Sequence, residues 1–99
     1  MAKLIDYDEA VADDLCDPEF AALLLANALL GDDPTTEFLC SLRRVVKARA
    51  NMSEVARELS ASRSSLYKAL SEKGNPELAT VLDVLDAVGL KLTVIPKAA

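Results

Sequence analysis

Residues 52–76, MSEVARELSASRSSLYKALSEKGNP, decide the fold. Small and aliphatic side chains recur there at helical spacing on one side of two predicted helices, 52–59 and 63–72. They are Val55, Ala56 and Leu59 in the first helix, and Leu66, Ala69 and Leu70 in the second. Because only the short segment 60–62 lies between them, the two helices must cross steeply and pack on each other. The segment therefore predicts a helix-turn-helix.

The start of the second predicted helix carries side chains suited to DNA. Ser62 can cap this helix, and the residues after it project from the exposed N-terminal half. From there they can reach phosphates and base edges in the major groove, and Arg63 is predicted to make a bidentate contact to guanine. The predicted DNA-binding residues of this helix are Ser62, Arg63, Ser64, Ser65, Tyr67 and Lys68.

Charge is divided unevenly along the chain, whose formal net charge is −5. Residues 1–41 contain ten acidic residues and one lysine, whereas residues 42–73 contain eight basic and three acidic residues. The basic block thus coincides with the predicted helix-turn-helix and the helix before it, which favours phosphate binding. The predicted phosphate contacts are Arg43, Arg44, Lys47, Arg57 and Lys73. The alternative is that these are ordinary solvated side chains on helix surfaces.

Length and composition limit the class of protein. At 99 residues the chain is predicted to be one domain with a modest core, short of a sizeable enzyme cleft. Apolar residues make up 52% and aromatic residues 4%, which favours packed helices. The most apolar run, 20–30, is too short to span a bilayer. Cys16 and Cys40 match no metal or redox spacing and no secretory signal is recognised, so we expect a cytoplasmic protein with reduced thiols.

Capping residues and prolines predict six helices, over 8–15, 18–30, 34–49, 52–59, 63–72 and 76–88. Asp17, Asp33 and Asn75 each precede a proline at the first helical position, where its missing N–H would have no helical partner. Asn51, followed by glutamate three residues later, resembles a capping box. Glycines fall at three predicted helix ends and can adopt the left-handed conformation there: Gly31, Gly74 and Gly89.

Two apolar segments remain without an obvious partner. Helix 18–30 carries leucines around much of its circumference, so it is either central to the core or part of an interface. After Gly89 apolar residues alternate, which predicts a short strand over 90–95 with no second strand in the chain. A lone strand leaves its backbone unpaired, so we expect antiparallel pairing with a copy in a two-fold homodimer. The predicted interface residues are Leu90, Leu92, Thr93, Val94 and Ile95; the alternative is an extended tail packed on the helices.

Several runs together carry a family resemblance: 52–59, 62–71, the turn 74–76, and the leucine-rich helix that ends at Gly89 and Leu90. Over about Phe38 to Pro96 the chain resembles phage-repressor-type helix-turn-helix proteins, and more narrowly the HigA-like antidote proteins of addiction modules. The acidic segments 6–8 and 17–20 in the N-terminal third resemble the same antidote subgroup. One departure is Ser60, where the wider family usually has glycine and where serine tolerates positive φ poorly.

The resemblance implies an all-α, lambda-repressor-like helix-turn-helix fold with extra N-terminal helices and one short C-terminal β-strand. We expect an acidic helical extension over 1–33 packed on the core, the DNA-binding domain over 34–89, and the strand and tail over 90–99. The implied function is that of a DNA-binding antitoxin of a type II toxin–antitoxin module. Such a homodimer binds a pseudo-palindromic operator in double-stranded DNA, represses its own operon and neutralises a small basic RelE/ParE-like toxin.

Two alternatives remain open at this point: a prophage-type transcriptional regulator without a toxin, and a protein-interaction module. A pure interaction module has no need of the basic block, whereas only the resemblance and the acidic N-terminal third separate the antitoxin from the regulator.

The acidic N-terminal third is the predicted toxin-binding surface, because acidic groups repel DNA phosphates and suit a basic partner. The predicted toxin-binding residues are Leu4, Ile5, Asp6, Tyr7, Asp8, Glu9, Asp13, Asp14 and Leu15. The alternative is that the acids only keep the protein soluble and steer it away from nonspecific DNA.

Catalysis is not expected, and neither a cofactor nor a metal is predicted, because the chain has no histidine, no paired-cysteine motif and no glycine-rich phosphate loop. Ser65 and Lys68 formally match a Ser-x-x-Lys motif but lack its companion motifs.

Overall fold

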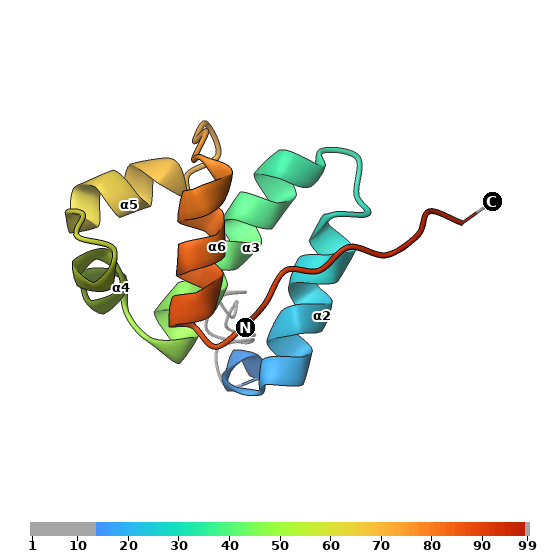
Figure 1. Cartoon of the computed structure of the whole chain (residues 1–99), viewed down its shortest axis with the longest axis horizontal. Coiled ribbons are helices and arrows are strands. Elements are labelled where there is room, and N and C mark those ends of the chain that lie inside the picture. The colour runs from blue at the N-terminus through green and yellow to red at the C-terminus, as the bar shows by residue number, and fades with distance from the viewer. Residues whose placement is uncertain (1–13, 99) are drawn as a thin grey trace, which may run out of the picture.

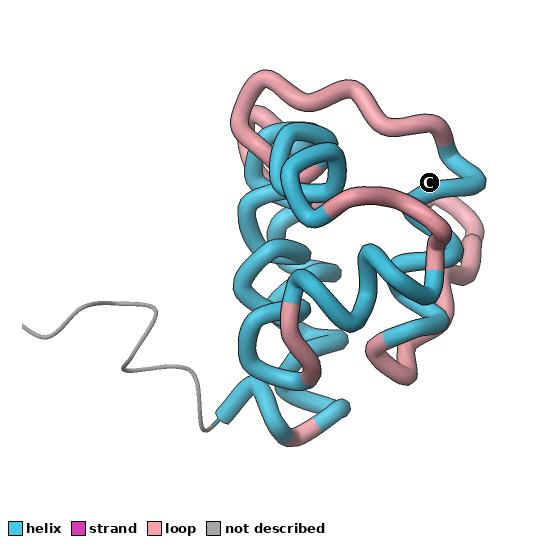
Figure 2. The backbone as a smooth tube through the Cα atoms, turned by 90° about the vertical axis from the view of Figure 1, so that its left-hand side faces the viewer, coloured by secondary structure: helices cyan, strands magenta, loops and turns pink. Residues whose placement is uncertain are grey.

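The computed structural model describes residues 14–98, which form helices joined by short connections (Figures 1 and 2). In chain order the elements are the 3-10 turn η1 (Asp14–Cys16), α2 (Pro18–Ala28), α3 (Pro34–Arg49), α4 (Met52–Glu58), α5 (Arg63–Ala69) and α6 (Leu78–Ala87). The predicted all-α class is confirmed over this range, and α2 to α5 begin at the predicted residues. The predicted helix 8–15 lies mostly outside the described residues.

Side-chain caps explain why α2, α3, α4 and α5 begin where they do. Four caps accept a hydrogen bond from a main-chain amide: Asp17 from Glu19 at 2.9 Å, Asp33 from Thr36 at 3.3 Å, Asn51 from Glu54 at 2.8 Å and Ser62 from Ser65 at 3.0 Å. Each of these bonds satisfies an amide that has no partner inside the helix.

The start of α6 differs from the prediction. Asn75 does not cap a helix from Pro76; α6 begins at Leu78, and the preceding Glu77 makes no side-chain capping bond. The cause lies in the connection from α5, which folds back so that Gly74 approaches the main-chain carbonyl of Ala69 too closely for a Cβ atom. The chain then stays extended through Glu77 before the helix can start. Gly74 is therefore required by close approach and not by a left-handed backbone, since Gly89 is the one glycine of residues 14–98 with positive φ.

The helices bury one continuous apolar core. The helices α2 and α3 lie side by side, α4 packs on α5, and α6 contacts α4 while lying in front of α3 in Figure 1. Leu42, Val45 and Val46 of α3 are fully buried, as are Leu70 after α5 and Val84 of α6. None of the helices in the described range is long and apolar enough to cross a membrane.

Helix α2 belongs partly to this core. Ala21 and Leu25 are buried in the same cluster as α3 and α6, whereas Leu23 is 59% exposed. The leucines around its circumference therefore serve a core face and leave a solvent-facing side. The two alternatives for helix 18–30, a place in the core and a place in an interface, thus each correspond to one side of α2.

The predicted strand over 90–95 is absent: residues 90–98 are extended without regular secondary structure, and residues 14–98 contain no strand. A strand is defined by hydrogen bonds to a neighbouring strand, and this part of the chain offers none. After Leu90 the tail crosses α2 and leaves the body of the molecule (Figure 1). The predicted alternation remains visible only as exposed apolar side chains, with Val94 at 92% and Ile95 at 79% exposure.

Arg49, at the end of α3, joins three parts of the fold. Its Nε donates to the carbonyl oxygen of Val88 at 2.8 Å, and its Nη1 donates to those of Cys16 at 2.8 Å and Leu15 at 3.4 Å. The guanidinium thus satisfies carbonyls at the end of α6 and in η1. Although it falls in the basic block, Arg49 acts here as a structural residue.

The turn after α4 contains Ser60, the one non-glycine residue of 14–98 with positive φ, at 55°. The Ser60 amide donates to the Arg57 carbonyl at 3.1 Å and the Ala61 amide to the Ala56 carbonyl at 2.8 Å, a Schellman motif. The same motif ends α6, with glycine (Gly89, φ 81°) in the left-handed position. Ser60 therefore occupies a position that favours glycine.

We expect Ser60→Gly to raise the free energy of unfolding by about 0.5–1 kcal/mol. The left-handed backbone costs an L-residue about 1–2 kcal/mol, part of which the greater entropy of unfolded glycine offsets. Urea denaturation of the purified variant measures the change. Gly89→Ser is the reciprocal control and should lower stability; an unchanged or lower stability of Ser60→Gly would contradict the strain at Ser60.

Candidate nucleic-acid interface

Helix α5 packs on the core through one side and exposes the other side to solvent. Leu66 and Leu70 are buried in the core together with Val55 and Ala56 of α4. Arg63, Ser64 and Ser65, by contrast, are exposed in the first turn of α5. The short connection after α4 thus orients the N-terminal turn of α5 outward.

Three predicted DNA-binding residues come together around one aromatic ring. The Tyr67 ring centroid lies 5.2 Å from Arg63 Cζ, one helical turn earlier on α5, and 5.6 Å from Lys47 Nζ on α3. Both distances fall within the range of cation–π contacts. The sequence predicted Lys47 as one of several phosphate contacts in the basic block, and the fold brings it to the Tyr67 ring of α5.

Two of the predicted serine contacts are occupied by the helix cap. Ser62 Oγ accepts the Ser65 amide and donates to Ser65 Oγ at 2.8 Å. Ser62 is thereby confirmed as the cap, and its hydroxyl is engaged within the turn. Ser64 is exposed next to Arg63.

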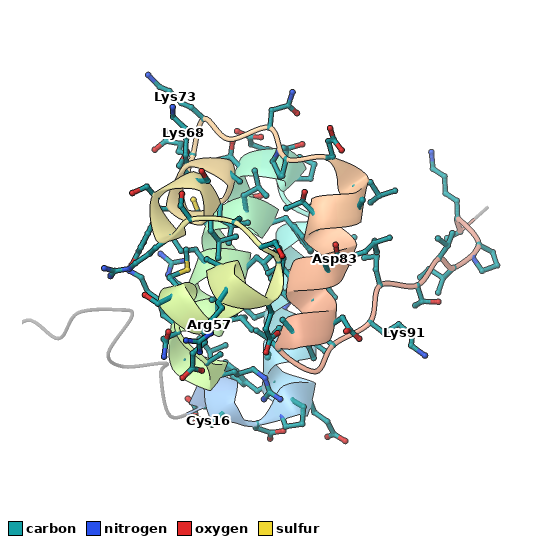
Figure 3. All side chains as sticks on the ribbon, turned by 60° about the vertical axis from the view of Figure 1, so that its left-hand side comes forward. Cys16, Arg57, Lys68, Lys73, Asp83 and Lys91 are labelled. Atoms are coloured by element: carbon teal, nitrogen blue, oxygen red, sulfur yellow. The ribbon has the colours of Figure 1, made fainter. Side chains whose placement is uncertain are left out.

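Lys68 and Lys73 extend the basic surface beyond the first turn. Both side chains point the same way at the far end of α5 (Figure 3), where they border a hollow. Arg57 is also exposed, but it lies on α4, well separated from these two lysines in the same view. The structure therefore gathers Lys68 and Lys73 with α5, and leaves Arg57 at a different part of the surface.

The two arginines in the middle of α3 are placed less favourably for contacting DNA phosphates together with α5. Arg43 and Arg44 are half-buried, and Arg44 lines a hollow between α2 and α3 together with Glu37. Arg44 thus lies on the α2 side of α3, away from α5. Helical spacing does not explain the difference, because side chains three residues apart lie on the same face of a helix. The neighbours differ instead: Arg44 borders a hollow that α2 lines, whereas Lys47 reaches the Tyr67 ring of α5.

Most predicted toxin-binding residues lie outside the described residues: Leu4, Ile5, Asp6, Tyr7, Asp8, Glu9 and Asp13. Asp14 is exposed. The assignment of Leu15 is corrected, because its side chain is 1% exposed and belongs to the core. An apolar residue in an acidic segment is equally suited to a core, and no feature of the sequence separates the two roles.

Four of the five predicted dimer residues border an apolar groove of about 530 Å³ between α2 and the tail. Leu90 is half-buried against the core, whereas Leu92, Thr93, Val94 and Ile95 are exposed. From the tail, Leu90, Leu92, Thr93 and Ile95 line the groove; Leu29 and Leu30 line it from the segment that follows α2. Helix 18–30 and the tail, considered separately in the sequence, thus contribute to one surface.

Comparison with known proteins finds one family model and one relative that match most of the chain. The model of a family described as "Probable addiction module antidote protein" matches residues 3–96. An uncharacterized protein of Haemophilus influenzae is 42% identical over 92 residues, which cover 93% of this chain and 91% of that protein. No solved structure matches the chain.

Proposed function

Because this chain belongs to the family of probable addiction module antidote proteins, we propose that it neutralises a toxin of RelE/ParE type and represses its own operon. In this proposal the antidote works in the cytoplasm as a binding protein, without catalysis. Two separate surfaces are required, one for DNA and one for the toxin. The uneven distribution of charge along the sequence supports such a division.

We propose that α4 and α5 act as a HigA-like, lambda-repressor-type helix-turn-helix, with α5 in the major groove. The observation that carries this proposal is that Arg63, in the exposed N-terminal half of α5, and Lys47 of α3 converge on the ring of Tyr67. Recognition helices contact base edges through this half, while neighbouring cations bind the phosphates that flank the groove. Lys68 and Lys73 add positive charge in the last turn of α5 and in the turn that follows it.

Replacing Arg63 with alanine should weaken binding to DNA from upstream of the gene by about 1–3 kcal/mol, or about 5- to 150-fold. The loss should depend on a single base pair, because a bidentate guanine contact specifies one position. Fluorescence anisotropy with a panel of single-base variants measures this dependence. Arg57→Ala is the comparison, since Arg57 is an exposed arginine on α4 and a predicted phosphate contact, so any weakening there should be equal on every duplex. Equal weakening on every duplex by Arg63→Ala would make Arg63 a phosphate contact too.

We also propose that the protein is a two-fold homodimer joined through the apolar groove and tail. The groove-lining residues Leu92 and Ile95 are 38% and 79% exposed in the single chain. A two-fold dimer buries the same patch on both copies and sets two α5 helices about 34 Å apart, one turn of duplex.

The variant Leu92→Asp/Ile95→Asp should therefore sediment as a monomer and bind a palindromic operator weakly, because charge is placed inside the interface. Analytical ultracentrifugation measures whether the variant is a monomer or a dimer. Leu78→Asp serves as control, since Leu78 is 64% exposed on α6 and does not line the groove. A double variant that remains dimeric would place the interface elsewhere.

A further inference from the structure

Tyr67 is half-buried, yet two cationic side chains lie against its ring. Arg63 Cζ is 5.2 Å and Lys47 Nζ is 5.6 Å from the ring centroid. Arg63 and Tyr67 are four residues apart on α5, the spacing at which helical side chains meet, whereas Lys47 comes from α3. The ring therefore joins the recognition helix to the helix beside it.

Such an arrangement addresses the main cost of binding with long cationic side chains. Arginine and lysine have many rotamers in solution, and ordering them on DNA costs conformational entropy. A ring that already attracts both cations limits those rotamers before DNA arrives. A planar guanidinium group that stacks on an aromatic ring also has a fixed plane. Bidentate recognition of one base requires such a fixed plane.

We propose that Tyr67 is a positioning residue that orders Arg63 and Lys47 in the free protein, so that Arg63 meets a base while Lys47 meets the adjoining phosphate. This rests on the proposed DNA binding by α5. Tyr67 then acts through its ring, and its hydroxyl need not touch DNA. The ring sets specificity indirectly, by holding Arg63 in the orientation that distinguishes one base pair.

The first test compares Tyr67→Leu with Tyr67→Phe on two duplexes, the DNA upstream of the gene and a scrambled duplex of equal composition. Tyr67→Leu should reduce the ratio of the two affinities about tenfold and change scrambled-duplex binding far less, because phosphate attraction remains. Tyr67→Phe keeps the ring and should restore most of that ratio. If Tyr67→Phe loses as much as Tyr67→Leu, the hydroxyl acts on DNA and the proposal fails.

The second test needs no DNA and compares the wild-type protein with the same two variants. Protons close to the face of an aromatic ring are shifted upfield in NMR spectra, so the Arg63 Cδ and Lys47 Cε protons should be shifted in wild type and Tyr67→Phe. In Tyr67→Leu they should return to ordinary positions, with circular dichroism confirming that the variant is folded. Unshifted protons in the wild type would overturn the proposal that Tyr67 orders Arg63 and Lys47. Failure of the wild type to bind DNA would instead overturn the proposed function, whatever the NMR result.

Discussion

Arg49→Ala is expected to lower the free energy of unfolding by about 3 kcal/mol and the Tm by roughly 12–24 °C. The guanidinium donates to the carbonyl oxygens of Val88, Cys16 and Leu15, so one truncation removes charged donors from three carbonyls. These carbonyls belong to the end of α6 and to η1, and the side chain that joins them comes from α3. Thermal and urea denaturation followed by circular dichroism measure the loss.

Two further variants show whether geometry or charge is responsible. Arg49→Lys keeps the charge but loses the planar fork, so it should recover only part of the stability. Arg57→Ala makes the same truncation at an exposed site on α4 and should change stability by less than about 0.5 kcal/mol. Wild-type stability in Arg49→Ala would contradict the bridging role of this arginine.

Removal of residues 1–13 is expected to abolish toxin neutralisation while leaving DNA binding within about threefold of wild type. These residues include Asp6, Asp8, Glu9 and Asp13, which we propose attract a basic toxin. The deletion ends before η1, because Leu15 is buried and its carbonyl, like that of Cys16, accepts a hydrogen bond from Arg49. Growth rescue with the co-expressed toxin measures neutralisation, and anisotropy with operator DNA measures DNA binding.

A charge-matched pair separates specific acids from general acidity. Asp6→Asn/Asp8→Asn/Glu9→Gln should slow toxin association at least about tenfold at low salt, since charge complementarity acts mainly on the association rate. Glu77→Gln/Asp83→Asn/Asp86→Asn removes the same number of charges at and within α6 and should leave the rate nearly unchanged. Equal slowing by both variants would assign the acids to solubility and long-range steering alone. Unchanged neutralisation by the deleted protein would contradict the toxin-binding proposal itself.

Local signals predicted the helices well where a cap acts within a few residues. Asp33 and Pro34 fixed the start of α3, and helical apolar spacing carried it to Arg49 as predicted. The start of α6 was missed because it depends on the shape of the turn after α5, in which Gly74 approaches the carbonyl of Ala69. The strand over 90–95 was wrong because a strand needs a partner, whereas alternation of apolar residues describes only one chain.

The candidate site was predictable in composition but not in arrangement. The exposed turn around Arg63 follows from the cap at Ser62 and the buried Leu66, both apparent in the sequence. Sequence spacing could not distinguish Lys47, which reaches Tyr67, from Arg44, which lies on the α2 side of α3. Arg49 and Leu15 have structural roles that arise only when η1, α3 and α6 meet.

The most direct measurement of the central proposal is the affinity of the wild-type protein for DNA upstream of its gene, compared with a scrambled duplex across a range of salt concentrations. A helix-turn-helix antidote with α5 in the major groove should bind its own DNA about a thousandfold more tightly, and both affinities should fall as salt rises. Binding to the two duplexes with equal affinity, or to neither, would contradict DNA recognition by α5.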